Sequence, residues 1–290
     1  MTRLTHGDIR HISPEITAHD QRLAAATGKG LLGIACHAWN LDETQAAQAL
    51  ARLETRVVPV TAGEGIITDF SATVAGILNF LGIPARVAPR PDVQGLARAY
   101  SQKAQALFMA DDFQFIGVNL ATGRVADNSF NTGKIYAAAL DLMAGKICDK
   151  PALVMGCGPV GHAAAHELAA RGARVFLHDI DPTPARELAQ DLKSNYPVDA
   201  TPTTDLARAL EQAPYIIEAT PAADTLPPEM LSHTRAVAAP GVPRGAGAQA
   251  RALLAPHWLH DKLELGVAAM AVHLIADECT PHEKEIPHGR

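Results

Sequence analysis

The chain has 290 residues, of which 48% are hydrophobic, and its formal net charge is −6 at pH 7. This length predicts about two domains, and the apolar content is sufficient for an ordinary core in each. A net negative charge disfavours nucleic acids and anionic membrane surfaces as partners, because both repel an acidic protein.

The cysteine pattern and the N-terminal segment favour a cytoplasmic location. The four cysteines are scattered and form no C-x-x-C pair, which is typical of a reducing compartment. Charged residues occupy the first positions, where a signal peptide needs an apolar run, and no stretch is long enough to span a membrane. We therefore expect a soluble protein without a targeting segment.

The first 55 residues read as helices, and a strand–helix alternation follows them. Thr5 and Asp8 have the spacing of a capping box, and we expect Pro14 to interrupt the first helix. Further helices are expected at 31–39 and 42–53. Strands at 56–60, 85–88 and 106–110 alternate with helices that end near 82 and 104, which predicts a parallel sheet. An edge hairpin over 115–125 and a helix over 131–145 complete this part of the chain.

A glycine-rich loop follows the next predicted strand. Residues 151–155 form a short apolar run without alternation, and the loop after it reads GCGPVG, with glycines at Gly156, Gly158 and Gly161. A helix is expected over 162–171. Strand, G-x-G-x-x-G and helix in this order are typical of a dinucleotide-binding fold, in which the helix N-terminus receives the pyrophosphate.

An acidic residue in the expected place supports the same interpretation. Residues 174–178 form a second short strand, and Asp179 follows it, where a carboxylate accepts hydrogen bonds from the ribose hydroxyls. Asp181 lies close by, and two carboxylates would repel a 2′-phosphate, so we expect NAD rather than NADP. The alternative is a glycine turn in an α/β domain that binds no nucleotide.

The α/β alternation continues to about residue 276. Strands are expected at 215–218 and 236–239, and helices at 185–192, 205–212, 247–254 and 266–276. The predicted fold class is α/β, with an N-terminal three-layer α/β domain followed by a Rossmann-type NAD(P)-binding domain. The predicted bounds are 1–147 for a substrate-binding domain, 148–276 for the cofactor domain and 277–290 for a loose tail. Substrate and cofactor should meet in the cleft between the domains.

Several side chains are candidates for chemistry. Asp111 and Asp112 end a predicted strand, where a carboxylate could hold an ammonium group or could merely cap a turn. His162 and His166 have the i, i+4 spacing that can hold a metal, but the sequence indicates no third ligand, so we expect a structural role and no metal site. Cys157 lies inside the glycine loop and is assigned no nucleophilic role. A hydrolase-type G-x-S-x-G motif is absent.

Six stretches of the sequence resemble the pyrrolysine synthase (PylD) family, the last enzymes of pyrrolysine biosynthesis. They are VVPVTAGEGIITDFSA (57–72), FMADD (108–112), DNSFNTGKIYA (127–137), GCGPVG (156–161), IIEATP (216–221) and APGVP (239–243). The similarity runs from Leu4 to about residue 275. It implies a homodimeric NAD-dependent oxidoreductase that converts L-lysine-Nε-3R-methyl-D-ornithine to pyrrolysine, with oxidation of the terminal amine carbon, ring closure and loss of ammonia.

The resemblance also implies roles for individual residues. Asp111 is implied to act at the catalytic site by holding the amino group of the ornithine part. The implied substrate pocket consists of Leu4, Ile67, Phe70, Ser71, Asp111 and Asn128. The implied cofactor contacts are Gly158, Pro159, Val160, Asp179, Thr220 and Pro221, to which the fingerprint adds Gly156 and Gly161.

The chain departs from the family pattern at two places, and two other functions compete with it. Ala238-Ala239 replaces a Ser-Thr pair, and Pro159 replaces a lysine in the glycine loop, which removes one N–H and one charge near the pyrophosphate. A different two-domain NAD(P) dehydrogenase of a small amino or cyclic acid would usually carry a substrate-domain lysine, which the 61–71 loop lacks. A non-catalytic NAD-binding module would bind the nucleotide without turnover.

Overall fold

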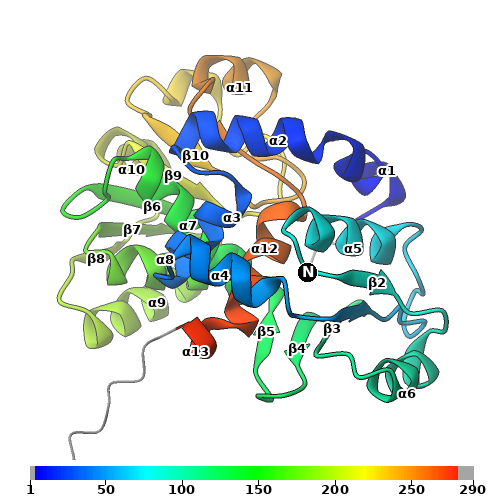
Figure 1. Cartoon of the computed structure of the whole chain (residues 1–290). Helices are drawn as coiled ribbons and strands as arrows, with labels where there is room; N and C mark the ends of the chain where they lie inside the picture. The colour runs from blue at the N-terminus through cyan, green and yellow to red at the C-terminus, as the bar shows by residue number, and fades with distance from the viewer. Residues whose placement is uncertain (1–3, 280–290) are drawn as a thin grey trace, which may run out of the picture.

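The computed structural model describes residues 4–279, and it contains two sheets with helices around them (Figure 1). Four helices come first: α1 (His6–Ile9), α2 (Ile12–Thr27), α3 (Leu31–Trp39) and α4 (Glu43–Leu50). The expected capping box is present, since the Thr5 backbone N–H donates to Asp8 Oδ2 at 2.8 Å. The first helix is interrupted before Pro14, as expected: α1 ends at Ile9 and α2 begins at Ile12. Pro14 lies in the first turn of α2, where no N–H is needed for an intrahelical bond.

The first sheet has the predicted parallel part and the predicted hairpin at its edge. Its strands are β1 (Thr55–Val57), β2 (Ala85–Val87), β3 (Ala106–Ala110), β4 (Phe115–Asn119) and β5 (Val125–Asp127), in the order β2-β1-β3-β4-β5. The first three are parallel, and β4 and β5 pair antiparallel. Successive side chains point to opposite faces. Phe108 therefore packs in the main core with α5 (Phe70–Phe80), whereas Leu107 packs with α6 (Asp92–Ser101).

The second sheet is parallel throughout. Its strands are β6 (Pro151–Met155), β7 (Arg174–His178), β8 (Ala200–Pro202), β9 (Tyr215–Glu218), β10 (Ala236–Ala238) and β11 (Trp258–Leu259), and their order is β11-β10-β9-β6-β7-β8. This is the Rossmann order, in which the chain reverses direction across the sheet between β6 and β9. The sequence had not indicated β8 or β11, which have only three and two residues.

Helices cover both faces of the second sheet. They are α8 (Pro159–Ala170), α9 (Pro182–Asn195), α10 (Leu206–Gln212), the 3₁₀ turn η1 (Pro228–Met230) and α11 (Ala248–Leu254). Val154 of β6 belongs to the core that α8 and α9 close, and its neighbour Leu153 belongs to the core beneath α10 and α11. Both faces of β6 are buried, which explains why its sequence is apolar without alternation.

Two helices lie between the sheets (Figure 1): α7 (Asn128–Met143) and α12 (Glu264–Leu274). Helix α7 begins three residues earlier than predicted, because the Asp127 side chain accepts a hydrogen bond from Phe130 N at 3.0 Å and so forms an N-cap. It contacts β4 and β5 of the first sheet and β9 and β10 of the second. Helix α12 follows the second sheet in the chain, yet it packs against α3, α5 and α7.

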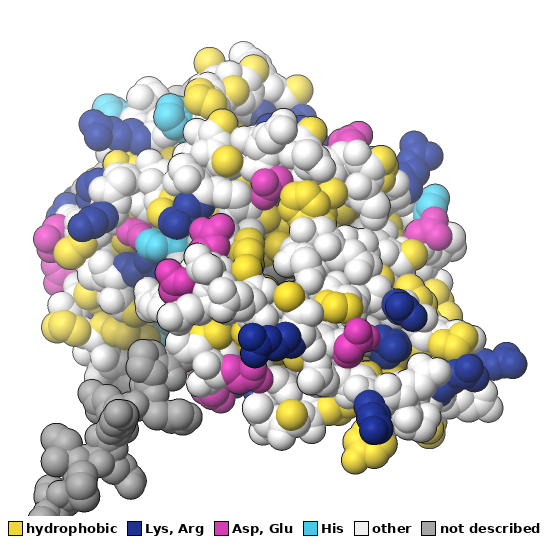
Figure 2. Space-filling model, viewed as in Figure 1, with side chains coloured by type: hydrophobic (Ala, Val, Ile, Leu, Met, Phe, Trp, Pro, Cys, Tyr) yellow, Lys and Arg dark blue, Asp and Glu magenta, His cyan; other side chains and the backbone are white. Residues whose placement is uncertain are grey.

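The predicted domain boundary at 147/148 falls between α7 and β6, and it stays a prediction. The predicted loose tail begins at residue 277, but the short helix α13 (Ala276–Cys279) includes its first three residues. The rest of the tail lies outside the described residues. Within residues 4–279, no helix combines the length and the apolar character that crossing a bilayer requires. Figure 2 shows that acidic and basic side chains are interspersed on the visible face.

The contact between α7 and α8 is close because Gly133 has no side chain. A Cβ atom at Gly133 would lie 2.2 Å from the carbonyl oxygen of Val160 and 2.7 Å from the Cβ of Ala163. Both neighbours belong to α8, and the first is backbone, so the helices would have to separate. The position of the glycine-loop helix relative to the first sheet therefore depends on this residue.

We expect Gly133→Ala to destabilise the chain by about 2–3 kcal/mol, because overpacking of a core forces backbone shifts of that cost. The check is urea unfolding followed by circular dichroism. Gly7→Ala is the control, since a Cβ there would meet only Thr5 Oγ1 at 3.7 Å. Equal stability of the two variants would show that α7 and α8 do not need to approach so closely.

A candidate active site between the two sheets

A cavity of about 510 Å³ lies where the two halves of the chain meet. Its lining includes all six residues of the expected substrate pocket: Leu4, Ile67, Phe70, Ser71, Asp111 and Asn128. It also includes five of the eight expected cofactor residues: Gly158, Pro159, Val160, Thr220 and Pro221. Gly156, Gly161 and Asp179 are not part of the lining. The fold thus brings segments that are more than 200 residues apart in the chain to one cavity.

The wall of the cavity on the first-sheet side is mainly apolar and comes from the start of α5. The Phe70 ring contacts Phe115 of β4 edge-to-face, with ring centroids 5.4 Å apart. Ser71 is buried in the first turn of the same helix. This wall suits the methylene and methyl carbons of a flexible ligand, because such carbons gain free energy when they leave water.

Asp111 lies at the end of β3, and its carboxylate has a structural task already. Oδ1 accepts hydrogen bonds from the backbone N–H groups of Phe113 and Gln114, both at 2.8 Å. These bonds lower the pKa of Asp111, because they stabilise the charged form. The side chain therefore caps the β3–β4 turn, as one of the two interpretations expected, and it also lines the cavity as an anion.

Asn128 is placed by the N-terminus of α7. It is the first residue after the Asp127 cap, and its Oδ1 accepts a hydrogen bond from Thr132 Oγ1 at 3.4 Å. Gly266 of α12 provides the space, since a Cβ atom there would lie 2.8 Å from Asn128 Oδ1. The Asn128 amide thus faces the cavity between α7 and α12, two helices that are far apart in the sequence.

The glycine loop has the geometry of a phosphate-binding turn. Gly156 has a φ of +85°, which favours glycine, and a Cβ at Gly161 would lie 1.8 Å from the Gly156 carbonyl oxygen. A Cβ at Gly158 would meet no heavy atom within 4 Å, so this position opens into free space. Because α8 begins at Pro159, the N–H groups of Val160 and Gly161 have no acceptor inside the helix. The loop therefore fits a pyrophosphate group.

Pro159 is the first residue of α8, where proline is favoured. Its missing N–H removes one donor from the anion site, but the next two donors remain.

Asp179 lies beside this turn at the end of β7. Its Oδ2 accepts from Cys157 N at 2.7 Å and its Oδ1 from Asp181 N at 3.1 Å. These bonds fix the carboxylate next to the glycine loop.

A buried carboxyl group positions the third segment of the predicted cofactor site. Glu218 ends β9 and is fully buried, and burial raises its pKa. Its Oε1 accepts hydrogen bonds from the Thr220 N–H at 3.1 Å and from Thr225 Oγ1 at 3.2 Å, as well as from the Thr220 hydroxyl. The turn at 219–221 is therefore held across from the glycine loop, at the point where the strand order reverses.

Sequence reasoning missed five polar residues of the lining: Ser129, Thr132, Tyr136, Asp261 and Lys262. Tyr136 donates to the Asp261 carbonyl oxygen at 3.0 Å and accepts from its N–H at 2.9 Å. Lys262 forms an ion pair with Asp8 of α1, which holds the pKa of Asp8 well below its usual range. Asp261 and Lys262 follow β11, so the signal that could have found them was the end of this unpredicted strand.

Two buried acidic residues, Asp261 of the lining and Glu264, lie close to each other. Asp261 Oδ2 lies 3.2 Å from His19 Nε2, and Glu264 is 7% exposed. Burial, together with the charge of Asp261, raises the pKa of Glu264 from 4.5 to about 7, although His19 opposes the shift. The folded chain therefore holds a proton on Glu264 at a pH where the unfolded chain has released it. The stability contribution of this group is complete below about pH 4.5 and is lost as the pH rises through 7.

We expect Glu264→Gln to unfold at higher urea concentration than the parent chain at pH 8, because glutamine cannot ionise in the buried site. The advantage at pH 8 should exceed that at pH 5 by about 2.5 kcal/mol, because the parent loses most of this stability as the pH rises from 5 through 7. The exposed Glu229→Gln is the control. If the free energy of unfolding of the parent and of Glu264→Gln changed equally between pH 5 and pH 8, the folded parent would not hold a proton on Glu264.

Cys157 agrees with the expectation that it is not a nucleophile. Burial, and then the nearby charge of Asp179, raise the pKa of its thiol to about 12. The thiol therefore stays protonated at neutral pH, and only the thiolate is reactive. Cys36, Cys148, Cys157 and Cys279 are all free thiols.

Comparisons with known proteins point to one family. The model of the N-terminal domain of pyrrolysine biosynthesis protein PylD matches residues 8–126. Pyrrolysine synthase of Methanosarcina barkeri is 32% identical over 271 residues, which cover 93% of this chain and 97% of that protein. Pyrrolysine synthase of Methanosarcina acetivorans is 29% identical over 275 residues, or 95% of this chain and 100% of that protein.

A solved structure supports the fold. Quinate dehydrogenase from Corynebacterium glutamicum, solved in complex with NAD, aligns with a TM-score of 0.52 over 76% of this chain and 92% of its own. Its 16% sequence identity indicates a shared fold rather than a shared substrate. Together with the identity and coverage of the Methanosarcina relatives, these observations show that the chain belongs to the pyrrolysine synthase (PylD) family.

Proposed function

We propose that the chain is an NAD-dependent oxidoreductase that makes pyrrolysine from L-lysine-Nε-3R-methyl-D-ornithine. The carbon that bears the terminal amine of the ornithine part is oxidised, the α-amino group of that part attacks the resulting imine, and ammonia leaves as the pyrroline ring closes. The observation that carries the proposal is a cavity that joins the glycine loop to Asp111 and Asn128 in a chain of this family.

The residues of the second sheet fit NAD. The open position at Gly158 and the N–H groups of Val160 and Gly161 would receive the pyrophosphate. Asp179 would accept hydrogen bonds from the ribose hydroxyls, and together with Asp181 it disfavours a 2′-phosphate. Bound NAD supplies the hydride acceptor for the oxidation of the amine.

The residues of the first sheet would hold the substrate. The Asp111 carboxylate is anionic and exposed to the cavity, so it can form a charge-assisted hydrogen bond to an ammonium group of the ornithine part. Asn128 and Ser71 offer neutral hydrogen bonds, and Ile67 and Phe70 cover the carbon chain. Ring closure joins two ends of one molecule, so the walls mainly need to hold the substrate folded and to limit water.

The direct test is incubation of the protein with NAD⁺ and the lysyl-methylornithine isopeptide. We expect NADH absorbance to rise and mass spectrometry to show a product that has lost ammonia. Turnover of quinate or shikimate instead would indicate a different two-domain dehydrogenase, and NAD binding without reduction by any of these compounds would indicate a binding module. The homodimer and the cytoplasmic location, which the family resemblance and the cysteine pattern suggested, stay predictions.

Asp111→Asn separates the two tasks of Asp111. Asparagine keeps an oxygen that can accept from Phe113 and Gln114, but it lacks the charge. We expect the KM for the isopeptide to rise roughly tenfold to a hundredfold, since a hydrogen bond to a charged group contributes about 1.5–3 kcal/mol. The Kd for NAD should stay the same. Asp205→Asn, which alters the N-cap of α10 outside the cavity, is the matched control. An unchanged KM would remove Asp111 from the substrate site.

Gly158→Ala tests the cofactor position without disturbing the fold. The added methyl group meets open space in the chain alone, and φ is −70°, so thermal stability should be unchanged. A pyrophosphate at the loop would collide with the methyl group, and we expect NAD binding to weaken roughly tenfold or more, for a cost of about 1–3 kcal/mol. Calorimetric titration with NAD measures this, and undiminished affinity would place the nucleotide elsewhere.

A further inference from the structure

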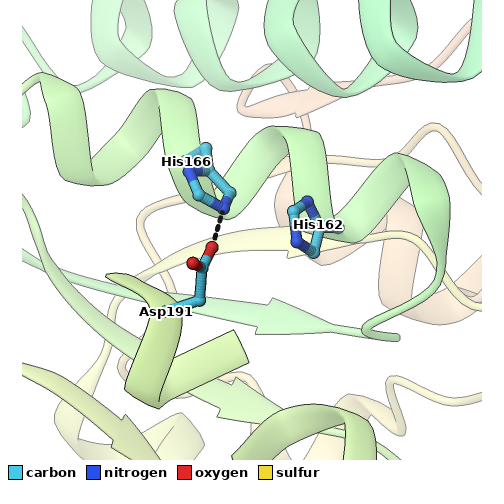
Figure 3. A group of neighbouring side chains, drawn as sticks. All are labelled: His162, His166 and Asp191. Carbon is cyan, nitrogen blue, oxygen red and sulfur yellow. Dashed lines mark ion pairs between the residues drawn. The ribbon is translucent and has the colours of Figure 1, made fainter. Parts of the chain in front are cut away.

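Helices α8 and α9 bring three metal-ligand side chains together outside the cavity. His162 and His166 lie on one side of α8, and Asp191 points toward them from α9 (Figure 3). One ligand atom from each residue lies within 4.8 Å of the other two. His166 Nε2 and Asp191 Oδ2 are 2.8 Å apart, and the two imidazole rings have centroids 4.5 Å apart. The third ligand that the sequence did not indicate is thus supplied by the next helix.

The surroundings orient these groups for coordination. Residues four apart face the same side of a helix, so both imidazoles are directed toward α9. His166 Nδ1 lies 3.4 Å from the Tyr196 hydroxyl, which leaves Nε2 for the shared position. Such a partner on the second ring nitrogen is usual for histidines that bind metals. His162 is exposed and, among residues 4–279, its ring has no hydrogen-bond partner, so the ring is free to turn.

We propose that His162, His166 and Asp191 form a binding site for a divalent first-row transition metal ion such as Zn²⁺. Two imidazoles and one carboxylate are a common donor set for this ion, and the fourth position would remain for water. Tetrahedral bonds of about 2.0–2.1 Å put ligand atoms roughly 3.3 Å apart. His166 Nε2 and Asp191 Oδ2 are 2.8 Å apart and would have to separate slightly, and the His162 ring would have to turn toward them, for all three ligand atoms to reach that spacing.

The site lies apart from the proposed chemistry. None of its three residues lines the cavity. Helix α8 nevertheless carries the glycine loop at its first turn, and α9 follows the loop that contains Asp179 and Asp181. A bound ion would therefore tie together the two helices whose N-terminal ends frame the nucleotide site. Its expected effect is on the stability of this helix pair.

The test is calorimetric titration of tag-free protein with Zn²⁺, together with the visible spectrum after addition of Co²⁺. We expect one ion per chain and a Co²⁺ spectrum typical of a coordination site of low symmetry. His162→Ala removes one ligand and keeps the His166–Asp191 pair, so it should fold normally and bind Zn²⁺ about a hundredfold more weakly, as expected for one ligand of such a site. Exposed His233→Ala is the matched control and should bind as the parent does.

Thermal unfolding provides a second reading. Zn²⁺ should raise the Tm of the parent and of His233→Ala, because an ion that binds only the folded chain stabilises it, and it should not raise that of His162→Ala. Circular dichroism in the presence of a chelator confirms that all three chains are folded. Equal zinc affinity of parent and His162→Ala, or absence of binding by the folded parent, would overturn the proposal and leave His166 and Asp191 as an ion pair between helices.

Discussion

The structure depends on the close approach of two helices at a residue without a side chain. Gly133 lets α7 lie against the backbone of α8, and the two helices belong to different halves of the molecule. Helix α7 begins with Asn128 at the cavity, and α8 begins with the glycine loop at the same cavity. Their separation therefore sets the distance between Asn128, at the proposed substrate site, and the glycine loop that would hold the nucleotide.

The proposed reaction makes modest demands on side-chain chemistry, and the cavity agrees with this. An amine oxidation followed by intramolecular ring closure needs a held cation, a folded carbon chain and a correctly placed hydride acceptor. Asp111, the wall around Phe70 and the loop at Gly158 match these three needs. Asp111 serves the fold and would serve the ligand as well, because the bonds that cap its turn also lower the pKa of its carboxylate.

Local features were predictable from the sequence, whereas contacts between distant segments were not. The glycine loop and the strand before it were found because their signals lie within a few residues and reflect backbone constraints. The two-residue strand β11 has no such signal, and its absence from the prediction hid Asp261 and Lys262. Asp191 could not be assigned to the two histidines, since only the packing of α9 on α8 brings it there. The start of α7 was misplaced because the cap at Asp127 was overlooked.

Because α12 packs against helices of the first half of the chain, the chain cannot be separated into two independent fragments between α7 and β6 without exposing apolar surface. This helix is encoded after the whole nucleotide-binding sheet, yet its buried sides face α3, α5 and α7. If the chain were divided between α7 and β6, the N-terminal fragment would expose the apolar surfaces of α3, α5 and α7 that α12 covers. The C-terminal fragment would contain α12 without these packing partners. The core around α3, α5 and α7 would therefore be complete only when both parts of the chain are present.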